Sequence, residues 1–287
     1  MTARRMVITG CSSGFGLEVA REARARGWHV LGTVRRQEDG AKLEEFGCDV
    51  ALLDLCDEAS TEAFGANARA WAQEAGVHCL VNNAGTSFPG PTIALTRDDF
   101  RAQFEVNTIG HMRVTRQLMP SLVQAQGRVL FISSVSAFLP TPMLGAYAAS
   151  KRALEALAEA FCLETEALGL STCIIEPGSY RTQIWKTSVA RGEAYRGERP
   201  EVEKPFQDYF ESLAEMTKQA ALSQPMGKPQ NLARFVLDQA EAKNVPLYAP
   251  TPGAPRTMRF FRWLMPARWL HGKVMQQLRR GRWRGGD

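Results

Sequence analysis

Residues 9–16 read TGCSSGFG. This stretch lies between an apolar, β-rich run and a segment with helical periodicity, so it predicts a turn from a strand into a helix. Gly10, Gly14 and Gly16 let the backbone turn tightly and let a pyrophosphate approach the N–H groups at the start of that helix. Glycines are common in such turns, but this one is the first strand-to-helix junction of the chain, which favours a dinucleotide-binding site.

The alternation of strand and helix continues along the chain. Apolar runs that we expect to be strands occupy residues 6–9, 29–34, 50–53, 79–82, 128–133, 171–175 and 246–248. Helical periodicity covers residues 14–26, 60–74, 98–125, 146–168 and 231–242. This order predicts an α/β protein in which a doubly wound parallel sheet is covered by helices on both faces. Because the strands continue almost to the end, we expect one domain over residues 1–250.

Two segments fall outside this alternation, an insertion at about residues 179–224 and a tail at residues 251–287. Between Pro255 and Arg284 the tail has nine Lys or Arg residues and no acid, although the net charge of the whole chain is only +5. The body is therefore mildly acidic and the tail is strongly basic.

Composition indicates an ordinary globular protein, with 45% hydrophobic and 23% charged residues in a chain of 287. The opening MTARRMVITG leads directly into an expected strand, without the apolar stretch of a secretory signal, and no apolar run reaches bilayer length. The six cysteines form no CxxC pair and do not cluster with the four histidines. We therefore expect reduced thiols, no metal site and a cytoplasmic location.

Arg35 and Arg36 directly follow the second expected strand, HVLGTV, where the adenosine ribose of a dinucleotide would lie. A carboxylate there would accept hydrogen bonds from a free 2′-hydroxyl, whereas a guanidinium pairs with a 2′-phosphate. The sequence therefore favours NADPH, with Arg35 on the phosphate and Ser12 or Ser13 as a further donor. Solvated surface arginines are the alternative reading, and NAD(H) stays open as the cofactor.

Residues 147–151 read YAASK and place Tyr147 and Lys151 one helical turn apart on one face. A phenol has a pKa of about 10, so acting as a base near pH 7 requires a shift of about three units. A nearby ammonium stabilises the phenolate and lowers its pKa, as would a cationic nicotinamide ring. Such pairs also occur by chance, as a partly buried tyrosine beside a solvated lysine. The neighbouring residues therefore determine whether the pair is interpreted as catalytic.

Two polar residues support a catalytic interpretation of that pair. Ser134 ends the expected strand VLFISS, at the carboxyl edge where open α/β sheets bind their ligands. Its hydroxyl can donate a hydrogen bond to a substrate carbonyl or accept one from an alcohol. Asn107 lies in the helical segment FEVNTIG, where a carboxamide is a mediocre helix former. It could hold a water that connects Lys151 to solvent.

These motifs resemble those of the short-chain dehydrogenase/reductase family. TGCSSGFG, NNAG at 82–85, Asn107, Ser134, YAASK and PGSYRT at 177–182 occur in the order and spacing of that family, over about residues 5–250. The resemblance is to the hydroxysteroid and retinol dehydrogenase branch. It implies a single Rossmann-like domain with NAD(P) lying across the carboxyl edge of the sheet.

The resemblance also implies roles. Tyr147 resembles the general acid/base, and Lys151 the group that lowers its pKa and binds the nicotinamide ribose. Ser134 resembles the residue that orients the substrate oxygen, and Asn107 the proton-relay residue. The implied cofactor-binding residues are Gly10, Ser12, Ser13, Gly14, Phe15, Gly16, Arg35, Asp54, Leu55, Asn83, Ala84, Gly85, Tyr147, Lys151, Pro177, Gly178 and Thr182. Tyr180 stands where the family usually has an aliphatic residue.

The insertion at residues 179–224 occupies the position of the family's substrate lid. Its apolar residues are Ile184, Trp185, Tyr195, Phe206, Tyr209, Phe210, Leu213 and Met216. Some of them can simply pack on the body, but so apolar a lid favours a bulky lipophilic substrate: a steroid, a retinoid or a long-chain carbonyl. We therefore expect an NADP(H)-dependent oxidoreductase acting on a carbonyl or secondary alcohol. A 3-oxoacyl thioester reductase and a non-catalytic dinucleotide sensor stay open as alternatives.

The tail mixes its basic residues with Phe260, Phe261, Trp263 and Trp269. This composition suits an interfacial helix on anionic lipid, which would make the protein peripheral to a membrane. A tail folded over the substrate cleft or a partner subunit explains it equally well. No nucleic-acid recognition module accompanies the charge, so we expect no nucleic-acid partner. The family resemblance implies a homodimer or homotetramer.

Overall fold

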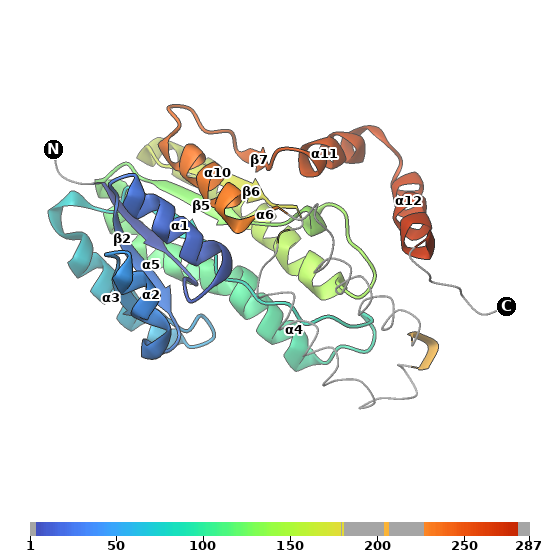
Figure 1. Ribbon diagram of the computed structural model, residues 1–287, viewed down its shortest axis with the longest axis horizontal. Helices are drawn as coiled ribbons and strands as arrows, with labels where there is room; N and C mark the ends of the chain where they lie inside the picture. The colour runs from blue at the N-terminus through green and yellow to red at the C-terminus, as the bar shows by residue number, and fades with distance from the viewer. Residues whose placement is uncertain (1–3, 179, 181–203, 207–226, 281–287) are drawn as a thin grey trace.

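The computed structural model describes residues 4–178, 180, 204–206 and 227–280. Its centre is a seven-stranded sheet in the order β3-β2-β1-β4-β5-β6-β7, in which every neighbouring pair is parallel (Figure 1). The strands are β1 (Arg5–Ile8), β2 (His29–Val34), β3 (Asp49–Leu52), β4 (Cys79–Asn82), β5 (Arg128–Ile132), β6 (Ser171–Glu176) and β7 (Tyr248–Pro250). The chain begins in the middle of the sheet and winds outward in both directions. The order therefore reverses between β1 and β4, which opens a crevice at the carboxyl edge.

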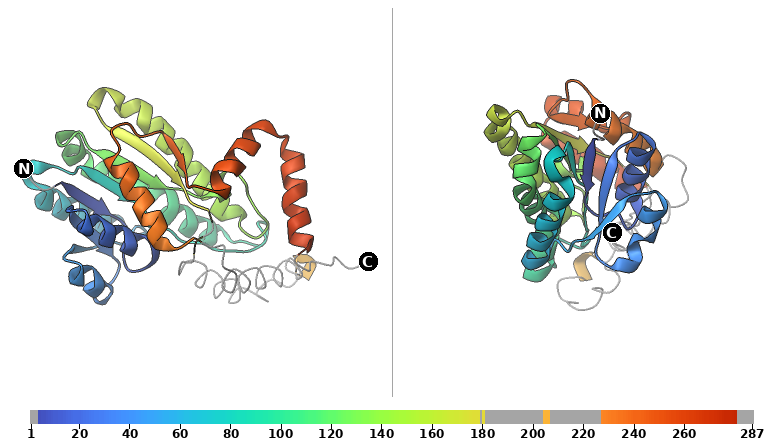
Figure 2. Two further views of the ribbon diagram at one scale, coloured as in Figure 1. Left: turned by 45° about the horizontal axis from the view of Figure 1, so that its top comes forward. Right: turned by 90° about the vertical axis from the view of Figure 1, so that its left-hand side faces the viewer.

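Helices cover both faces of the sheet (Figure 2). One face packs against α1 (Gly14–Ala25), α2 (Ala41–Glu45) and α10 (Pro229–Glu241). The other packs against α3 (Glu58–Ala72), α5 (Gly110–Gln124) and α6 (Gly145–Thr165). Along β1, Met6 and Ile8 join the first core and Val7 joins the second. Strands buried on both faces read as continuous apolar runs, which is why the sequence predicts them so directly.

Short helical turns connect these elements. They are η1 (Gln37–Gly40), η2 (Gln73–Ala75), η4 (Val135–Ala137), η5 (Glu166–Leu168) and η6 (Lys204–Phe206). The fold class that the sequence predicts, a Rossmann-like doubly wound α/β sheet, is confirmed. The last strand lies slightly later than expected, at Tyr248–Pro250 instead of residues 246–248.

The long helix expected over residues 98–125 is divided into three parts. These are α4 (Arg97–Phe104), a π-helical turn η3 (Glu105–Ile109), and α5, and Asn107 lies at the centre of the π turn. A π turn adds a residue to one turn without interrupting the helix, so the sequence interpretation covers all three parts with one helix. Such turns are frequent at functional sites.

The basic tail forms two further helices, α11 (Ala254–Leu264) and α12 (Ala267–Arg280), which lie beyond one end of the sheet (Figures 1 and 2). Helix α11 contacts β7 and η4. The predicted lid lies outside the described residues, except for Tyr180 and the turn η6, which contains Phe206. Within the described part of the chain, no helix is both long enough and apolar enough to cross a membrane.

Candidate active site

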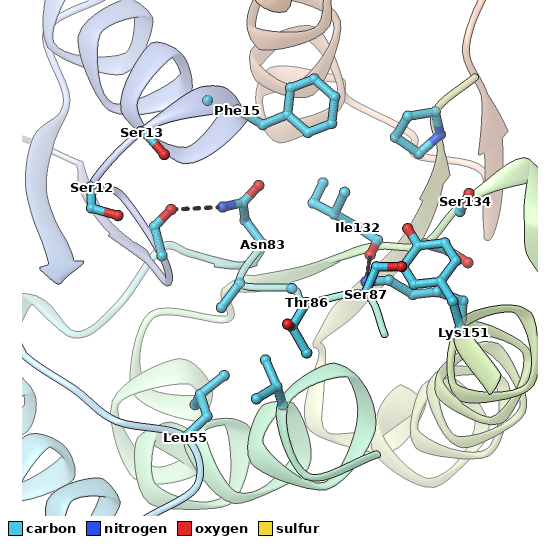
Figure 3. A pocket seen from close by; sticks show the side chains of 18 of the residues that line it. Ser12, Ser13, Phe15, Leu55, Asn83, Thr86, Ser87, Ile132, Ser134 and Lys151 are labelled. Atoms are coloured by element: carbon cyan, nitrogen blue, oxygen red, sulfur yellow. Dashed lines mark hydrogen bonds between the residues drawn. The ribbon is translucent and has the colours of Figure 1, made fainter. Parts of the chain in front are cut away.

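A cavity of about 430 Å³ opens at the carboxyl edge of the sheet, where the strand order reverses. The loops that follow strands β1 to β6 all contribute to its lining. In Figure 3, Ser12, Ser13 and Phe15 lie on one side, and Ser134 and Lys151 lie on the other. The sequence-predicted site residues that line the cavity are Gly10, Ser12, Ser13, Gly14, Phe15, Arg35, Asp54, Leu55, Asn83, Ala84, Gly85, Ser134, Tyr147, Lys151, Pro177 and Gly178.

Three predicted residues do not line it. Gly16 is buried behind the β1–α1 loop, and a Cβ there would lie 2.2 Å from the backbone oxygen of Gly10. Asn107 lies behind Gly85, whose Cβ position would be 3.6 Å from the Asn107 Oδ1. Thr182 lies outside the described residues.

The β1–α1 loop fits a phosphate group. Gly10 has a φ of 73°, and a Cβ there would come within 2.8 Å of the Ala84 Cα, so the loop packs tightly on the segment after β4. Asn83 holds the two together, because its Nδ2 donates to the backbone oxygens of Thr9 (2.8 Å) and Gly10 (3.1 Å). Ser13 caps α1 without a side-chain hydrogen bond to it, and the first turn has no acidic residue. The amides at the helix start therefore suit an anion in the cavity.

The two arginines after β2 differ in their surroundings. The Arg36 guanidinium pairs with Asp39 (3.2 Å) and Glu38 (3.4 Å) at the surface. Arg35 is exposed and lines the cavity, as does Asp54, whose Oδ1 accepts a hydrogen bond from the backbone N–H of Cys56 (2.9 Å). The guanidinium of Arg35 therefore suits a phosphate at this end of the cavity.

Tyr147 and Ser134 form a hydrogen-bonded pair. Tyr147 lies in the first turn of α6, and Ser134 follows β5, where its Oγ accepts a hydrogen bond from the backbone N–H of Ser136 (3.1 Å). Burial raises the pKa of Tyr147 above its ordinary value, and the hydrogen bond with Ser134 opposes the rise. The phenol is therefore protonated at neutral pH.

The role of Lys151 in lowering the pKa of Tyr147 stays a prediction. Lys151 is buried, and its Nζ donates to the backbone oxygen of Ile132 (2.7 Å). Burial lowers the pKa of Lys151 to about 8, and the carboxylate of Glu155 opposes that shift. In this structure burial dominates the pKa of Tyr147, and the ammonium is held by the Ile132 oxygen.

Glu155 is a site neighbour that the sequence interpretation missed. Ser133 Oγ donates to its Oε1 (2.7 Å), and Arg152 pairs with its Oε2 (3.0 Å). It lies four residues after Lys151, so it repeats the spacing that separates Tyr147 from Lys151. That repeated spacing is the signal that could have revealed it.

Asn107 uses its side chain to join two elements. Its Oδ1 accepts from the backbone N–H of Thr86 (2.8 Å), and its Nδ2 donates to the Thr86 backbone oxygen (2.9 Å) and to Ser150 Oγ (3.0 Å). The side chain therefore fixes the loop after β4 against α6, the helix that carries Tyr147 and Lys151. The proton-relay role of Asn107 stays a prediction.

A buried ion pair ties the tail to the site. Arg259 of α11 pairs with Glu176 at the end of β6, a carboxylate with no solvent exposure. Burial raises the pKa of Glu176 to about 7, and Arg259 opposes the rise. The nearby carboxylate of Glu155 adds to the rise in the pKa of Glu176, and the second oxygen of Glu176, Oε2, is buried without a hydrogen-bond partner. Because Arg259 and Glu176 are far apart in the sequence, no local sequence pattern predicts their ion pair.

The model of the short chain dehydrogenase family matches residues 4–192. The chain belongs to the short-chain dehydrogenase family. As a member, this short-chain dehydrogenase is an oxidoreductase with an NAD(P)-binding Rossmann-like fold, as the resemblance of its motifs predicts.

Three known proteins illustrate the relationship. The chain is 31% identical to an NADPH-dependent 3-dehydrocapnine reductase of Ornithobacterium rhinotracheale, over 79% of this chain and 80% of that protein. It is 39% identical to human retinol dehydrogenase 5, over 62% of this chain and 57% of that protein. A solved short-chain dehydrogenase of Streptomyces avermitilis superposes with a TM-score of 0.73 at 26% identity, covering 98% of this chain and 99% of the other.

Proposed function

We propose that this short-chain dehydrogenase transfers a hydride between NADP(H) and a carbonyl or secondary alcohol on a lipophilic small molecule. The observation that carries the proposal is the arrangement of the cavity. Ser134 and Lys151 lie on one side, and the anion-suited start of α1 lies on the other. Tyr147 also lines the cavity, from the same helix as Lys151. Such a cavity suits a dinucleotide whose pyrophosphate lies at α1 and whose reactive end lies beside the tyrosine.

Each side chain has a role in the proposal. Bound NADPH supplies the hydride, which is chemistry that the protein side chains lack. Ser134 donates a hydrogen bond to the substrate carbonyl oxygen, and Tyr147 donates the proton that this oxygen needs. Because the pKa of Tyr147 is raised, the phenol carries this proton at neutral pH. Lys151, Pro177 and Gly178 line the cavity, where Lys151 would hold the nicotinamide ribose and the other two would contact the carboxamide. These assignments fit the reductive direction best.

Two observations support NADPH over NADH. Arg35 lines the cavity, while its neighbour Arg36 is engaged by carboxylates. The relative from Ornithobacterium rhinotracheale is named for its dependence on NADPH. NAD(H) would lack the 2′-phosphate that a guanidinium binds.

The lipophilic substrate class rests on the apolar part of the cavity lining, to which Phe15, Phe88, Val106, Leu144 and Tyr180 contribute. Tyr180 packs edge-on against Phe15, with ring centroids 5.3 Å apart. The similarity to human retinol dehydrogenase 5 also supports a lipophilic substrate. Assembly into dimers or tetramers, the division into a catalytic domain and a tail, and a cytoplasmic location stay predictions.

A substrate panel tests this function. Purified protein is assayed with steroid, retinoid and long-chain ketones and aldehydes, each with NADPH and with NADH. We expect turnover of at least one lipophilic carbonyl, with NADPH preferred. A reaction confined to 3-oxoacyl thioesters on acyl carrier protein would support the alternative reductase. NADPH binding without turnover of any compound would support the sensor.

The pKa values predict how reduction depends on pH. Tyr147 stays protonated well above neutral pH, whereas Lys151 loses its charge as the pH rises through about 8. Because the charged Lys151 is the form assigned to the nicotinamide ribose, kcat/KM for reduction should be level near neutral pH. It should then fall about tenfold per unit above pH 8, as this charge is lost. In Glu155→Gln the carboxylate that raises the pKa of Lys151 is gone, so the fall begins at lower pH. A rate that stays level to pH 10 in both proteins would contradict this assignment.

A further inference from the structure

The tail helix α11 has its charged and apolar faces reversed relative to an ordinary surface helix. Pro255, Arg259 and Arg262 recur at helical spacing, with Pro255 buried, Arg259 partly buried and Arg262 exposed. Arg259 pairs with the buried Glu176 and lies 3.6 Å from the centroid of the Tyr248 ring, and Arg262 Nε donates to the backbone oxygen of Phe138 (3.2 Å). Two cations of α11 are therefore used to hold it on the protein.

The opposite face of α11 is aromatic and exposed. Trp263 is 82% exposed, and Phe260, Phe261 and Leu264 beside it are also exposed. The Phe260 ring lies 6.0 Å from the Phe261 ring and 6.4 Å from the Trp263 ring, so the three form one cluster. A helix that faces only water usually turns its polar side outward.

Helix α12 continues the aromatic surface and adds charge to it. Trp269 is exposed, and the Lys273 ammonium lies 5.4 Å from the centroid of its ring. Arg256 of α11 and Arg268 of α12 are exposed as well. Since no acid occurs between Pro255 and Arg284, this surface has cations and aromatic rings but no anion of its own.

We propose that the tail surface, formed by the exposed residues of α11 and α12, docks the protein on an anionic phospholipid bilayer. Aromatic and leucine side chains insert at the level of the headgroups, and the surrounding Arg and Lys residues attract anionic lipid. The two helices lie at one end of the molecule, beyond the sheet (Figures 1 and 2). This inference is independent of the proposed function.

Charge favours lipid over a second copy of the chain. A twofold contact through this surface would bring the same cationic tail against itself. Like charges placed opposite one another across an interface oppose association. An anionic bilayer instead complements every exposed cation of the tail.

The test is binding of the full chain to vesicles of phosphatidylglycerol and phosphatidylcholine, compared with vesicles of phosphatidylcholine alone. We expect co-sedimentation with the anionic vesicles, a blue shift of tryptophan fluorescence, and release at about 0.5 M salt. Trp263→Ser with Leu264→Ser, and separately Arg268→Glu with Lys273→Glu, should each weaken binding by about tenfold or more.

Leu163→Ser is the matched control, because Leu163 is 77% exposed on α6, outside the tail. It should bind vesicles like the wild type, and circular dichroism should show that all variants are folded. The proposal would be overturned if the wild type did not bind anionic vesicles, or if the tail and control variants bound equally. It would also be overturned if the tail variants changed only the oligomeric state, because the surface would then serve a second copy.

Discussion

Replacing Tyr147 with phenylalanine should lower kcat for carbonyl reduction by about 10²- to 10⁴-fold. The change removes one hydroxyl, which is the proton donor in the proposed reaction and the hydrogen-bond partner of Ser134. The ring that fills the space beside α6 remains, so the fold should be unaffected. Affinity for NADPH, measured by fluorescence titration, should stay within a few-fold of the wild type.

Ser134→Ala is the companion variant. It keeps the phenol but removes the hydroxyl that positions the substrate oxygen and opposes the rise in the pKa of Tyr147. We expect lower kcat with Tyr147 still required, so the double variant should be little worse than Tyr147→Phe alone. Full activity in Tyr147→Phe would remove the basis of the mechanism.

Replacing Arg35 with alanine should lower kcat/KM for NADPH by about 10- to 100-fold and change the value for NADH little. The expected loss is that of a charge-assisted hydrogen bond to the 2′-phosphate, about 1.5–3 kcal/mol. The measurement is the ratio of kcat/KM for the two cofactors with one substrate.

Arg36→Ala provides the matched control for Arg35→Ala. Arg36 is the adjacent arginine, but its guanidinium pairs with Asp39 and Glu38 at the surface. Its removal should leave the cofactor ratio nearly unchanged. Equal use of NADPH and NADH by the wild type, or equal effects of the two substitutions, would contradict the role of Arg35.

The sequence predicts the sheet well because parallel strands are buried on both faces. Met6, Val7 and Ile8 are all apolar, since alternate residues face different helical layers. The glycines of TGCSSGFG also predict their turn correctly. Gly10 packs against Ala84, and Gly16 packs against Gly10, with no space for a Cβ at either position. Motifs at the ends of strands then place most of the predicted site on one cavity.

The remaining features depend on contacts between distant residues or on side-chain conformation. Arg259 of α11 pairs with Glu176 of β6, and the pKa of Glu176 is also raised by Glu155 of α6, so groups from three elements far apart in the chain act on one another. Lys151 has a long side chain with several conformers, and helical spacing cannot show that its ammonium contacts the Ile132 oxygen. The sequence therefore predicts that Tyr147 and Lys151 share one helix face, but it does not show that burial raises the pKa of Tyr147.

The most direct test of the central claim is a single turnover with NADPH that carries deuterium at both hydrogens of C4. A lipophilic ketone or aldehyde that the enzyme accepts is mixed with the loaded protein, and the alcohol formed is analysed by mass spectrometry. We expect deuterium on the carbinol carbon with the wild type, and no product on the same timescale with NADPH-bound Tyr147→Phe. Product without deuterium, or transfer by Tyr147→Phe at the wild-type rate, would contradict the account.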